Sequence, residues 1–374
     1  MASMIKRNYR NTNLYLPTFK QEMLDFDLRA RKQDIFSIER TSSGKRSFKW
    51  QNPSRGTIYQ VYKNVNFSIY SGAKCNGNCS FCVEKLRPLS RGTTLEDQKN
   101  VVDADTYFKK MWKTFELVRP LNPSLSITGG EPSLDPYLQK IGKLVDLFNF
   151  RKRTITTNGS GLLSKKLLSH LVEAKFQHLN LSRAHHDDEA NNRFMQLEPY
   201  LSNDDVIKII NKIGSTQLRP RLSCVLLKNG INNLRDIIEY LEWAAKIGVD
   251  NLVFRQLMEH DKETYKPDPV IDFCNKNRVF LAPLLREIYL NKNVHHPSFS
   301  FIKQVIGYYY YVEVYQYKSK FGRSIDVVFE EADLTFVETD KSKGRMHSQI
   351  HELIFHQNGK LCSTWQPWDG IILD

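Results

Sequence analysis

The chain has 374 residues, 41% of them hydrophobic and 25% charged, which is enough for one barrel-sized domain or two smaller ones. Its longest aromatic stretch, YYYYVEVYQY at 308–317, is too short and too polar to cross a membrane. Residues 1–11 lack the apolar core of a signal peptide. These features predict a soluble, cytoplasmic protein.

The net charge of +13 is unevenly distributed along the chain. Residues 1–60 contain 12 Lys or Arg against 5 Asp or Glu, which accounts for +7 of the total. A basic segment of this kind can bind nucleic acid, or it can be a solvated surface that keeps the protein soluble. The charge pattern leaves both interpretations open, and neither involves a membrane.

From about residue 60, short runs rich in β-branched residues alternate with amphipathic stretches. The predicted strands are 64–70, 125–129, 153–158, 178–182, 221–227 and 251–258. The predicted helices between them are 103–118, 136–150, 164–175, 203–214 and 232–248, each beginning near Asp, Ser, Asn or Pro. This alternation predicts parallel βαβ units that form either an open doubly wound sheet or an incomplete barrel.

The pattern changes after residue 260. Residues 270–290 are predicted to form one more helix, whereas 324–338 and 350–365 alternate like strands. The second strand pair turns at Asn358-Gly359, a dipeptide typical of hairpins. We expect a β-rich C-terminal appendage that covers the barrel mouth and is not an independent domain.

Four motif-like segments each follow directly on a predicted strand. They are CNGNCSFC at 75–82, GGEP at 129–132, TNG at 157–159 and SRAHHDD at 182–188. Because the carboxyl ends of parallel strands meet at one edge, these segments are expected to converge on one site.

The first of these segments contains three cysteines, Cys75, Cys79 and Cys82. Three thiolates suit zinc or an iron–sulfur cluster. A structural zinc site needs a fourth ligand, and no second Cys or His pair follows within the next hundred residues. A cubane held by three cysteines instead leaves one iron open for a further ligand.

The spacing Cys75-x3-Cys79-x2-Cys82, with an aromatic residue before the last cysteine, resembles the signature of the radical S-adenosylmethionine (SAM) superfamily. The resemblance covers about residues 60–260. It implies a partial (β/α)6 TIM-type barrel, with one [4Fe–4S] cluster whose open iron binds SAM. It also implies that an electron from a donor such as flavodoxin or ferredoxin cleaves SAM to a 5′-deoxyadenosyl radical, which abstracts hydrogen from the substrate. The corresponding domain prediction is a basic extension at 1–58, a core at 59–260 and a substrate-covering region at 261–374.

The resemblance also implies roles for residues at the strand ends. Glu131 matches a carboxylate that holds the SAM amino group, and Ser182 matches a contact to its carboxylate or ribose. Phe81 and Met258 match positions near the adenine. The full set assigned to SAM is Phe81, Gly129, Gly130, Glu131, Pro132, Thr157, Asn158, Ser182 and Met258.

Within the superfamily, the motif order most resembles the branch of the GTP 3′,8-cyclase of molybdenum-cofactor synthesis. The chain departs from that branch in lacking a second set of cluster cysteines, since only Cys362 lies in the tail. It also has Ser68 and Ser126 where that enzyme has arginines. We therefore expect a shared barrel, one cluster and a substrate bound differently.

The basic residues near the strand ends predict a polar, anionic substrate that is a nucleotide or nucleoside-like. The candidate substrate contacts are Arg183, His185, His186, Arg221 and Arg255. Each has an ordinary alternative, since an arginine can form a structural ion pair and Asp187 and Asp188 can cap a helix. Cys362 is a candidate hydrogen-atom donor or a small buried residue, and Cys224 and Cys274 are expected to be packing residues.

Three alternative functions stay open. The first is a peptide-modifying radical SAM enzyme, an epimerase or cross-linking enzyme, whose precursor docks on the basic N-terminal segment. The second is a nucleic-acid-binding protein with a structural metal site. The third is an interaction protein that retains a catalytically silent barrel.

Overall fold

The computed structural model describes residues 37–40, 47–71, 75–89, 94, 102–258, 260, 265–291, 298–306, 310–332 and 349–374. Most of the predicted basic extension, residues 1–36 and 41–46, lies outside the described residues. None of the helices in the described part of the chain is long and apolar enough to cross a membrane.

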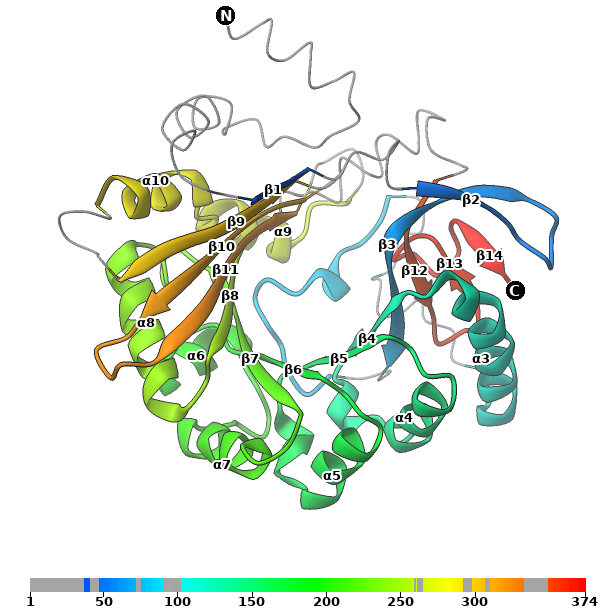
Figure 1. The fold of residues 1–374 in the computed structure, drawn as a ribbon, viewed down its shortest axis with the longest axis horizontal. Helices are drawn as coiled ribbons and strands as arrows, with labels where there is room; N and C mark the ends of the chain where they lie inside the picture. The colour runs from blue at the N-terminus through cyan, green and yellow to red at the C-terminus, as the bar shows by residue number, and fades with distance from the viewer. Residues whose placement is uncertain are drawn as a thin grey trace, which may run out of the picture.

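Six parallel strands form the centre of the molecule, and helices cover their outer face (Figure 1). The strands are β3 (Ile58–Ser71), β4 (Ser124–Gly129), β5 (Lys152–Thr157), β6 (His178–Ser182), β7 (Arg219–Leu226) and β8 (Asn251–Gln256). The helices between them are α3 (Ala104–Val118), α4 (Leu138–Leu147), α5 (Lys165–Glu173), α6 (Asp188–Met195), α7 (Asn203–Ile213) and α8 (Leu234–Ile247). This is the predicted partial (β/α)6 barrel.

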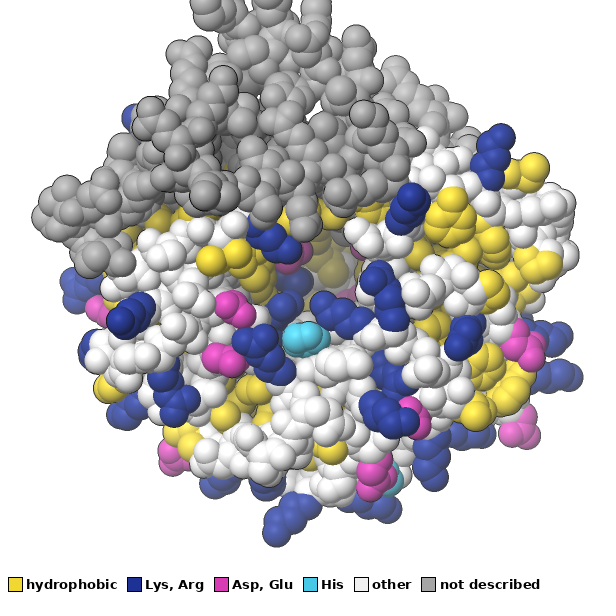
Figure 2. All heavy atoms as spheres, viewed as in Figure 1, with side chains coloured by type: hydrophobic (Ala, Val, Ile, Leu, Met, Phe, Trp, Pro, Cys, Tyr) yellow, Lys and Arg dark blue, Asp and Glu magenta, His cyan; other side chains and the backbone are white. Residues whose placement is uncertain are grey.

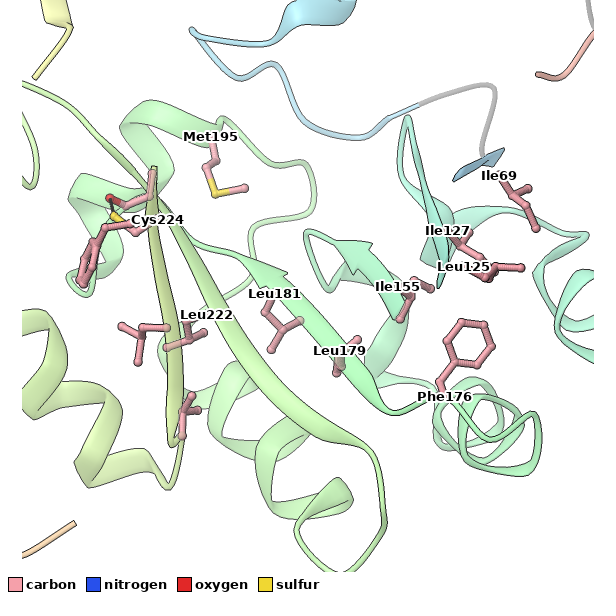
Figure 3. Close-up of a cluster of buried hydrophobic side chains, with 14 of the residues drawn as sticks. Ile69, Leu125, Ile127, Ile155, Phe176, Leu179, Leu181, Met195, Leu222 and Cys224 are labelled. Carbon is pink, nitrogen blue, oxygen red and sulfur yellow. Dashed lines mark hydrogen bonds between the residues drawn. The ribbon is translucent and has the colours of Figure 1, made fainter. Parts of the chain in front are cut away.

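The alternation of side chains along each strand produces one apolar face. Leu125 and Ile127 of β4, Ile155 of β5 and Leu179 and Leu181 of β6 are at most 2% exposed. Figure 3 shows these side chains in one layer that continues from strand to strand beside the helices. Burying a side chain of this size stabilises the fold by about 1.5–3 kcal/mol. The opposite face of these strands, which lines the barrel interior, is therefore not needed for this core and is available to contact a ligand.

Polar side chains begin most of the helices at the positions where the sequence predicts them. Asp103 accepts a hydrogen bond from the Thr106 N–H at the start of α3, and Asn233 does the same for the Asp236 N–H at the start of α8. Ser202 and Asp205 form a capping box at the start of α7. Each such cap satisfies a backbone N–H that has no partner within the helix.

The C-terminal part extends the same sheet at both of its edges. Beyond β8 lie β11 (Ser324–Ala332), β10 (Tyr310–Lys318), β9 (Phe299–Ile306) and β1 (Ser37–Arg40), and beyond β3 lie β12 (Gln349–Phe355), β13 (Leu361–Cys362) and β14 (Ile371–Leu373). The hairpin of β12 and β13 confirms the predicted turn, at which Gly359 has a positive φ of 76°. Because β11 and β12 pair directly with β8 and β3, this β-rich part continues the barrel wall. The predicted domain boundaries stay a prediction.

Two segments differ from what the sequence predicts. Residues 270–290 form two helices, α9 (Pro269–Asn277) and α10 (Leu281–Asn291), rather than one. The break occurs where Arg278 makes a β-bridge with Leu227 and the Gln256 side chain accepts from the Leu281 N–H, 2.8 Å away. The aromatic stretch at 308–317, for which no structure was predicted, contributes most of β10.

The residues that follow β2 (Ser47–Gln51) are joined to the end of the chain. β2 pairs with the first half of β3 in an antiparallel ladder. The buried Asn52 side chain donates to the Ile372 carbonyl at 2.9 Å, and Arg55 donates to the Ile371 carbonyl at 2.8 Å. These bonds satisfy backbone carbonyls of β14, the last strand at that edge of the sheet.

Candidate functional site

The three clustered cysteines lie on a loop that follows the carboxyl end of β3. Cys75 is exposed, whereas Cys79 and Cys82 are half-buried. The loop ends in a short 3-10 turn, Val83–Lys85. The position at the end of the first barrel strand is the one that the sequence predicts.

The segment 194–198, which begins in the last turn of α6, supports this cysteine loop through backbone hydrogen bonds. The Asn78 N–H donates to the Met195 carbonyl at 3.2 Å, and the Ser80 N–H donates to the Phe194 carbonyl at 3.1 Å. In return, the Glu198 N–H donates to the Asn76 carbonyl at 2.9 Å. Sequence reasoning missed this support, because nothing in the residues 194–198 marks them as partners of a segment more than a hundred residues away.

The loop and its support approach each other closely at Gly77. A Cβ atom at this position would lie 2.9 Å from Leu197 Cδ2 and 3.3 Å from the Met195 carbonyl oxygen. Only glycine allows the backbone to come this near. Lys85 holds the other side of the loop, where its Nζ donates to the Cys79 carbonyl at 3.1 Å and to the Asn78 side chain.

The three thiols are near enough to influence one another electrostatically. Burial raises the pKa of Cys79 to about 12, and the neighbouring Cys82 and Cys75 add to the rise. Burial likewise raises the pKa of Cys82 to about 11. No three His, Cys, Asp or Glu side chains of the described residues converge tightly enough to hold a single metal ion.

This arrangement fits a cubane cluster better than a single ion. A zinc ion needs all its ligands about 2.0–2.3 Å from one point, whereas a cubane offers separate iron atoms to separate thiolates. Three cysteines spread along one loop, with no fourth cysteine on it, match a cubane, which binds separate thiolates through separate iron atoms. Cys75, Cys79 and Cys82 are therefore the residues that would hold a [4Fe–4S] cluster.

The ends of β3 and β4 are packed together at Gly129. This residue has a φ of 137°, and a Cβ atom here would lie 2.2 Å from the Ser71 carbonyl oxygen and 2.8 Å from the Ser71 nitrogen. The Ser71 hydroxyl in turn donates to the Asp135 carboxylate at 2.5 Å. The predicted GGEP segment thus begins with a glycine that the backbone requires.

Glu131, the acidic residue of this segment, joins the ends of β4 and β5. Its carboxylate accepts from the backbone N–H groups of Ser133 at 2.9 Å and Asn158 at 2.6 Å, and also from the Ser133 and Thr157 hydroxyls. The side chain is 1% exposed, and this burial raises its pKa while the hydrogen bonds oppose the rise. The carboxylate thus holds Thr157 and Asn158, and its predicted contact with SAM stays a prediction.

Asn158 connects the end of β5 to the cysteine loop. Its amide nitrogen lies 2.8 Å from the Asn76 Oδ1 atom and 3.9 Å from the Cys75 Sγ atom. Asn76 also donates to the Ser160 hydroxyl at 2.9 Å. Three of the predicted segments, the cysteine loop, GGEP and TNG, are therefore in contact, as expected for strand ends that share one edge.

Arg183, His185 and His186 lie on the helix side of the β6 end. Arg183 is 2% exposed and bonds to the Asp188 and Asn203 side chains and the Leu201 carbonyl. The two histidine rings stack with centroids 4.5 Å apart, and His186 packs edge-on against Tyr240 of α8. The bonds of Arg183 are those of a structural ion pair, and the two histidines pack against each other and Tyr240. We therefore leave Arg183, His185 and His186 out of the proposed site.

The other predicted site residues are dispersed over the barrel. Ser182 ends β6 on its inner face, Met258 follows β8, and Phe81 packs partly into the core. Cys362 is 0% exposed on β13, separated from the barrel strands by β12. The carboxyl-end site therefore consists mainly of the cysteine loop and the ends of β4 and β5.

A family model described as the radical SAM superfamily matches residues 69–274, more than half of the chain. The chain belongs to the radical SAM superfamily. It is therefore an enzyme of the class that uses a [4Fe–4S] cluster and SAM. No curated protein sequence matches it.

A solved structure with a TM-score above 0.5 shares the fold, and others are similar over shorter parts of the chain. SuiB of Streptococcus suis bound to SAM is 17% identical over 81% of this chain and 61% of its own, with a TM-score of 0.51. SuiB bound to its precursor peptide SuiA is 20% identical over 74% of this chain and 58% of its own, with a TM-score of 0.45. The protein anSMEcpe with bound SAM is 19% identical over 51% of this chain and 50% of its own, with a TM-score of 0.39.

This radical SAM chain thus spans about 61% of the length of the first of these structures. The comparisons confirm the superfamily predicted from the cysteine spacing. They do not support a particular closeness to the GTP cyclase branch.

Proposed function

We propose that this radical SAM enzyme abstracts a hydrogen atom from a polar, anionic, nucleotide-like substrate that binds inside the barrel. The observation that supports this most is the contact of Asn158 with Asn76 and Cys75, at 2.8 and 3.9 Å. It joins the cysteine loop to the end of β5, so that a cluster on the loop would adjoin the barrel interior. A nucleotide or nucleoside-like molecule remains the preferred substrate, and a peptide is the alternative.

In this proposal the cofactors supply the reactive species and the protein positions them. Cys75, Cys79 and Cys82 would hold the cluster, which would supply the electron for reductive cleavage of SAM and so the radical that takes a hydrogen atom from the substrate. A donor such as flavodoxin or ferredoxin would supply that electron to the cluster.

The chain's own residues hold in place the segments that would surround those cofactors. Segment 194–198 and Lys85 hold the cysteine loop, and Glu131 holds the end of β5 by accepting from Thr157 and Asn158. Gly129 lets the ends of β3 and β4 pack together, and Gly130, which has no side chain, would let a ligand beside the loop approach the backbone. Such pre-positioning lowers the entropic cost of bringing cofactor and substrate together.

The test is anaerobic reconstitution with iron and sulfide, followed by reduction with SAM. We expect about four irons per chain and formation of 5′-deoxyadenosine. Cys79→Ala should lose the iron and all 5′-deoxyadenosine. Cys362→Ala, which removes another buried thiol, should keep both.

Two results would contradict the proposal. One is a reconstituted wild-type protein that forms no 5′-deoxyadenosine, and the other is a Cys79→Ala protein that matches the wild type. The substrate class is tested by adding nucleoside phosphates or peptides to the reconstituted enzyme. We expect nucleoside phosphates to accelerate 5′-deoxyadenosine formation more than peptides do.

A further inference from the structure

The inner face of the barrel is polar from one strand to the next. Ser68 of β3 is opposite Ser126 of β4, which is opposite Thr154 of β5, and Thr154 is opposite His178 of β6. In closed barrels of this type the inward positions are filled by Val, Ile and Leu, which pack into a core. A row of hydroxyl and imidazole side chains cannot form such a core. The interior therefore suits water and a polar ligand.

Three cationic or imidazole side chains gather at the amino ends of the neighbouring strands β5, β6 and β7. They are Lys152, His178 and Arg221, and their charges act on one another. Partial burial, followed by the nearby Arg221, lowers the pKa of Lys152. Burial, followed by Lys152 and Arg221, lowers the pKa of His178 to about 4. This group lies at the end of the barrel opposite the cysteine loop, which follows the carboxyl end of β3.

Another arginine at this end is neutralised by carboxylates, since Arg219, the first residue of β7, pairs with Asp250 at 3.0 Å and with Asp326 at 3.1 Å. Near the carboxyl end of β8, Arg255 pairs with Glu330 at 3.3 Å. Within the described part of the chain, no carboxylate lies within ion-pair distance of Lys152 or Arg221. Arg221 uses its Nε to donate to the neutral Asn251 side chain at 2.5 Å, which leaves both of its terminal nitrogens available.

Two buried polar atoms beside these cations also lack partners among the described residues. They are the Nδ1 atom of His178 and the Oδ1 atom of Asn180, two residues further along β6. Asn180 is 8% exposed, and its amide nitrogen donates to the Thr156 hydroxyl at 3.2 Å. A buried polar atom without a hydrogen bond costs about 1–3 kcal/mol, so unpaired atoms beside unpaired cations indicate a place for a ligand.

We propose that Lys152, His178 and Arg221 bind a phosphate group of the substrate at the amino ends of β5, β6 and β7. This inference rests on the proposed function and names the anionic group that the substrate carries. Two positive charges with no carboxylate in ion-pair contact match a phosphate monoester, whose charge near neutral pH is about −1.5 to −2, better than they match one carboxylate. The free edge of the Arg221 guanidinium can donate two parallel hydrogen bonds to phosphate oxygens.

The length of the barrel sets the size of such a substrate. β6 has five residues from His178 to Ser182, which places its two ends about 13 Å apart at a rise of about 3.3 Å per residue. A molecule with phosphate at His178 and its reacting carbon near Ser182 therefore has the length of a nucleoside phosphate. Figure 2 shows Lys and Arg side chains around a hollow near the middle of one face, with a His beside them.

The test measures phosphate binding with pyrophosphate as the probe, by titration calorimetry on the reconstituted enzyme without reductant. We expect Lys152→Gln and Arg221→Gln each to weaken binding about tenfold and the double variant to abolish it. Lys143→Gln, on the exposed outer side of α4, should bind like the wild type. Addition of pyrophosphate should also shift the imidazole NMR signals of His178, assigned by their loss in His178→Gln.

Two outcomes would overturn the inference. In the first, Lys152→Gln and Arg221→Gln bind pyrophosphate as tightly as the wild type, with the His178 signals unmoved. In the second, citrate binds more tightly than pyrophosphate and loses affinity in the same variants, which assigns the site to carboxylates. Because no reductant is present, phosphate binding is measured independently of SAM cleavage. A failure of 5′-deoxyadenosine formation would then contradict only the proposed radical chemistry.

Discussion

At the carboxyl ends of the barrel strands the polar side chains are bonded to one another, whereas at the amino ends of β5–β7 the cations Lys152 and Arg221 have no ion-pair partner among the described residues. Glu131 accepts hydrogen bonds from Ser133, Thr157 and Asn158. Lys152 and Arg221, in contrast, are near each other, and no carboxylate is in ion-pair contact with either. The first end is rigid, because every group that orders it belongs to the protein. The second suits a ligand, because two of its cations lack a direct carboxylate partner.

The largest effect is expected from crowding the carboxyl end. Gly129→Ala would place a Cβ atom 2.2 Å from the Ser71 carbonyl oxygen, at a φ of 137° that side chains rarely adopt. We expect a loss of about 3–5 kcal/mol in the free energy of unfolding, from overpacking and backbone strain together. Chemical denaturation measures it, and iron retention should fall as well.

Gly322→Ala is the matched control for this substitution. Gly322 also has a positive φ, 76°, but a Cβ atom there would meet nothing within 4 Å. Only backbone strain remains, so the expected cost is about 1–2 kcal/mol. Equal costs for the two variants would show that the ends of β3 and β4 are not held in close contact.

A smaller effect is expected when the amino end is acidified. His178, surrounded by Lys152, Arg221 and Arg219, has its pKa lowered to about 4 by burial and by these charges. The unfolded chain takes up this proton near pH 6.5, so stability is lost as the pH falls from about 6.5 toward 4. The wild type should therefore lose more stability than His178→Gln between pH 7 and pH 5. Since solvent screens a half-buried group, the difference should be about 1 kcal/mol.

Denaturation of both proteins at the two pH values checks this. Carboxylates elsewhere titrate equally in the two proteins, so they cancel in the comparison. A loss that is the same with and without His178 would mean that the three cations do not disfavour its protonation.

The smallest effect has the opposite sign. Lys152→Gln removes one of two neighbouring positive charges, and we expect the ligand-free protein to become more stable by about 0.5 kcal/mol. Lys143→Gln should change nothing. Thermal unfolding measures both variants, and a destabilised Lys152→Gln would mean that Lys152 stabilises the folded protein and is not reserved for a ligand.

The carboxyl end could be predicted from sequence largely because its residues are consecutive. Cys75, Cys79 and Cys82 form a local motif, and the strands that carry GGEP and TNG begin and end within about two residues of their predicted positions. The orientation of Glu131 toward β5 could not be predicted, because it depends on which strand end lies nearest. The support of the cysteine loop by residues 194–198 depends in the same way on contacts made only in the folded chain.

Of the three residues at the amino end, sequence reasoning identified only Arg221 as a candidate and did not predict the group. Lys152, His178 and Arg221 are separated by 26 and 43 positions, and each begins or nearly begins a strand, where a charged residue is ordinary. Only the register of β5, β6 and β7 brings them together. Arg221 was predicted as a substrate contact from the family resemblance, whereas its two neighbours carry no motif.

Because β3 pairs with β12, one edge of β3 stays uncovered during most of the synthesis of the chain. β3 spans Ile58–Ser71, and the strand that covers its outer edge, β12, begins only at Gln349. Ribosomes add about 5–20 residues per second, so the inner barrel strands are synthesised well before that edge can be covered. An open edge of a parallel sheet is a template for pairing with other chains. β12 is thus what covers this edge of the barrel wall against pairing with other chains, and the edge is covered only after residues 349–355 have been synthesised.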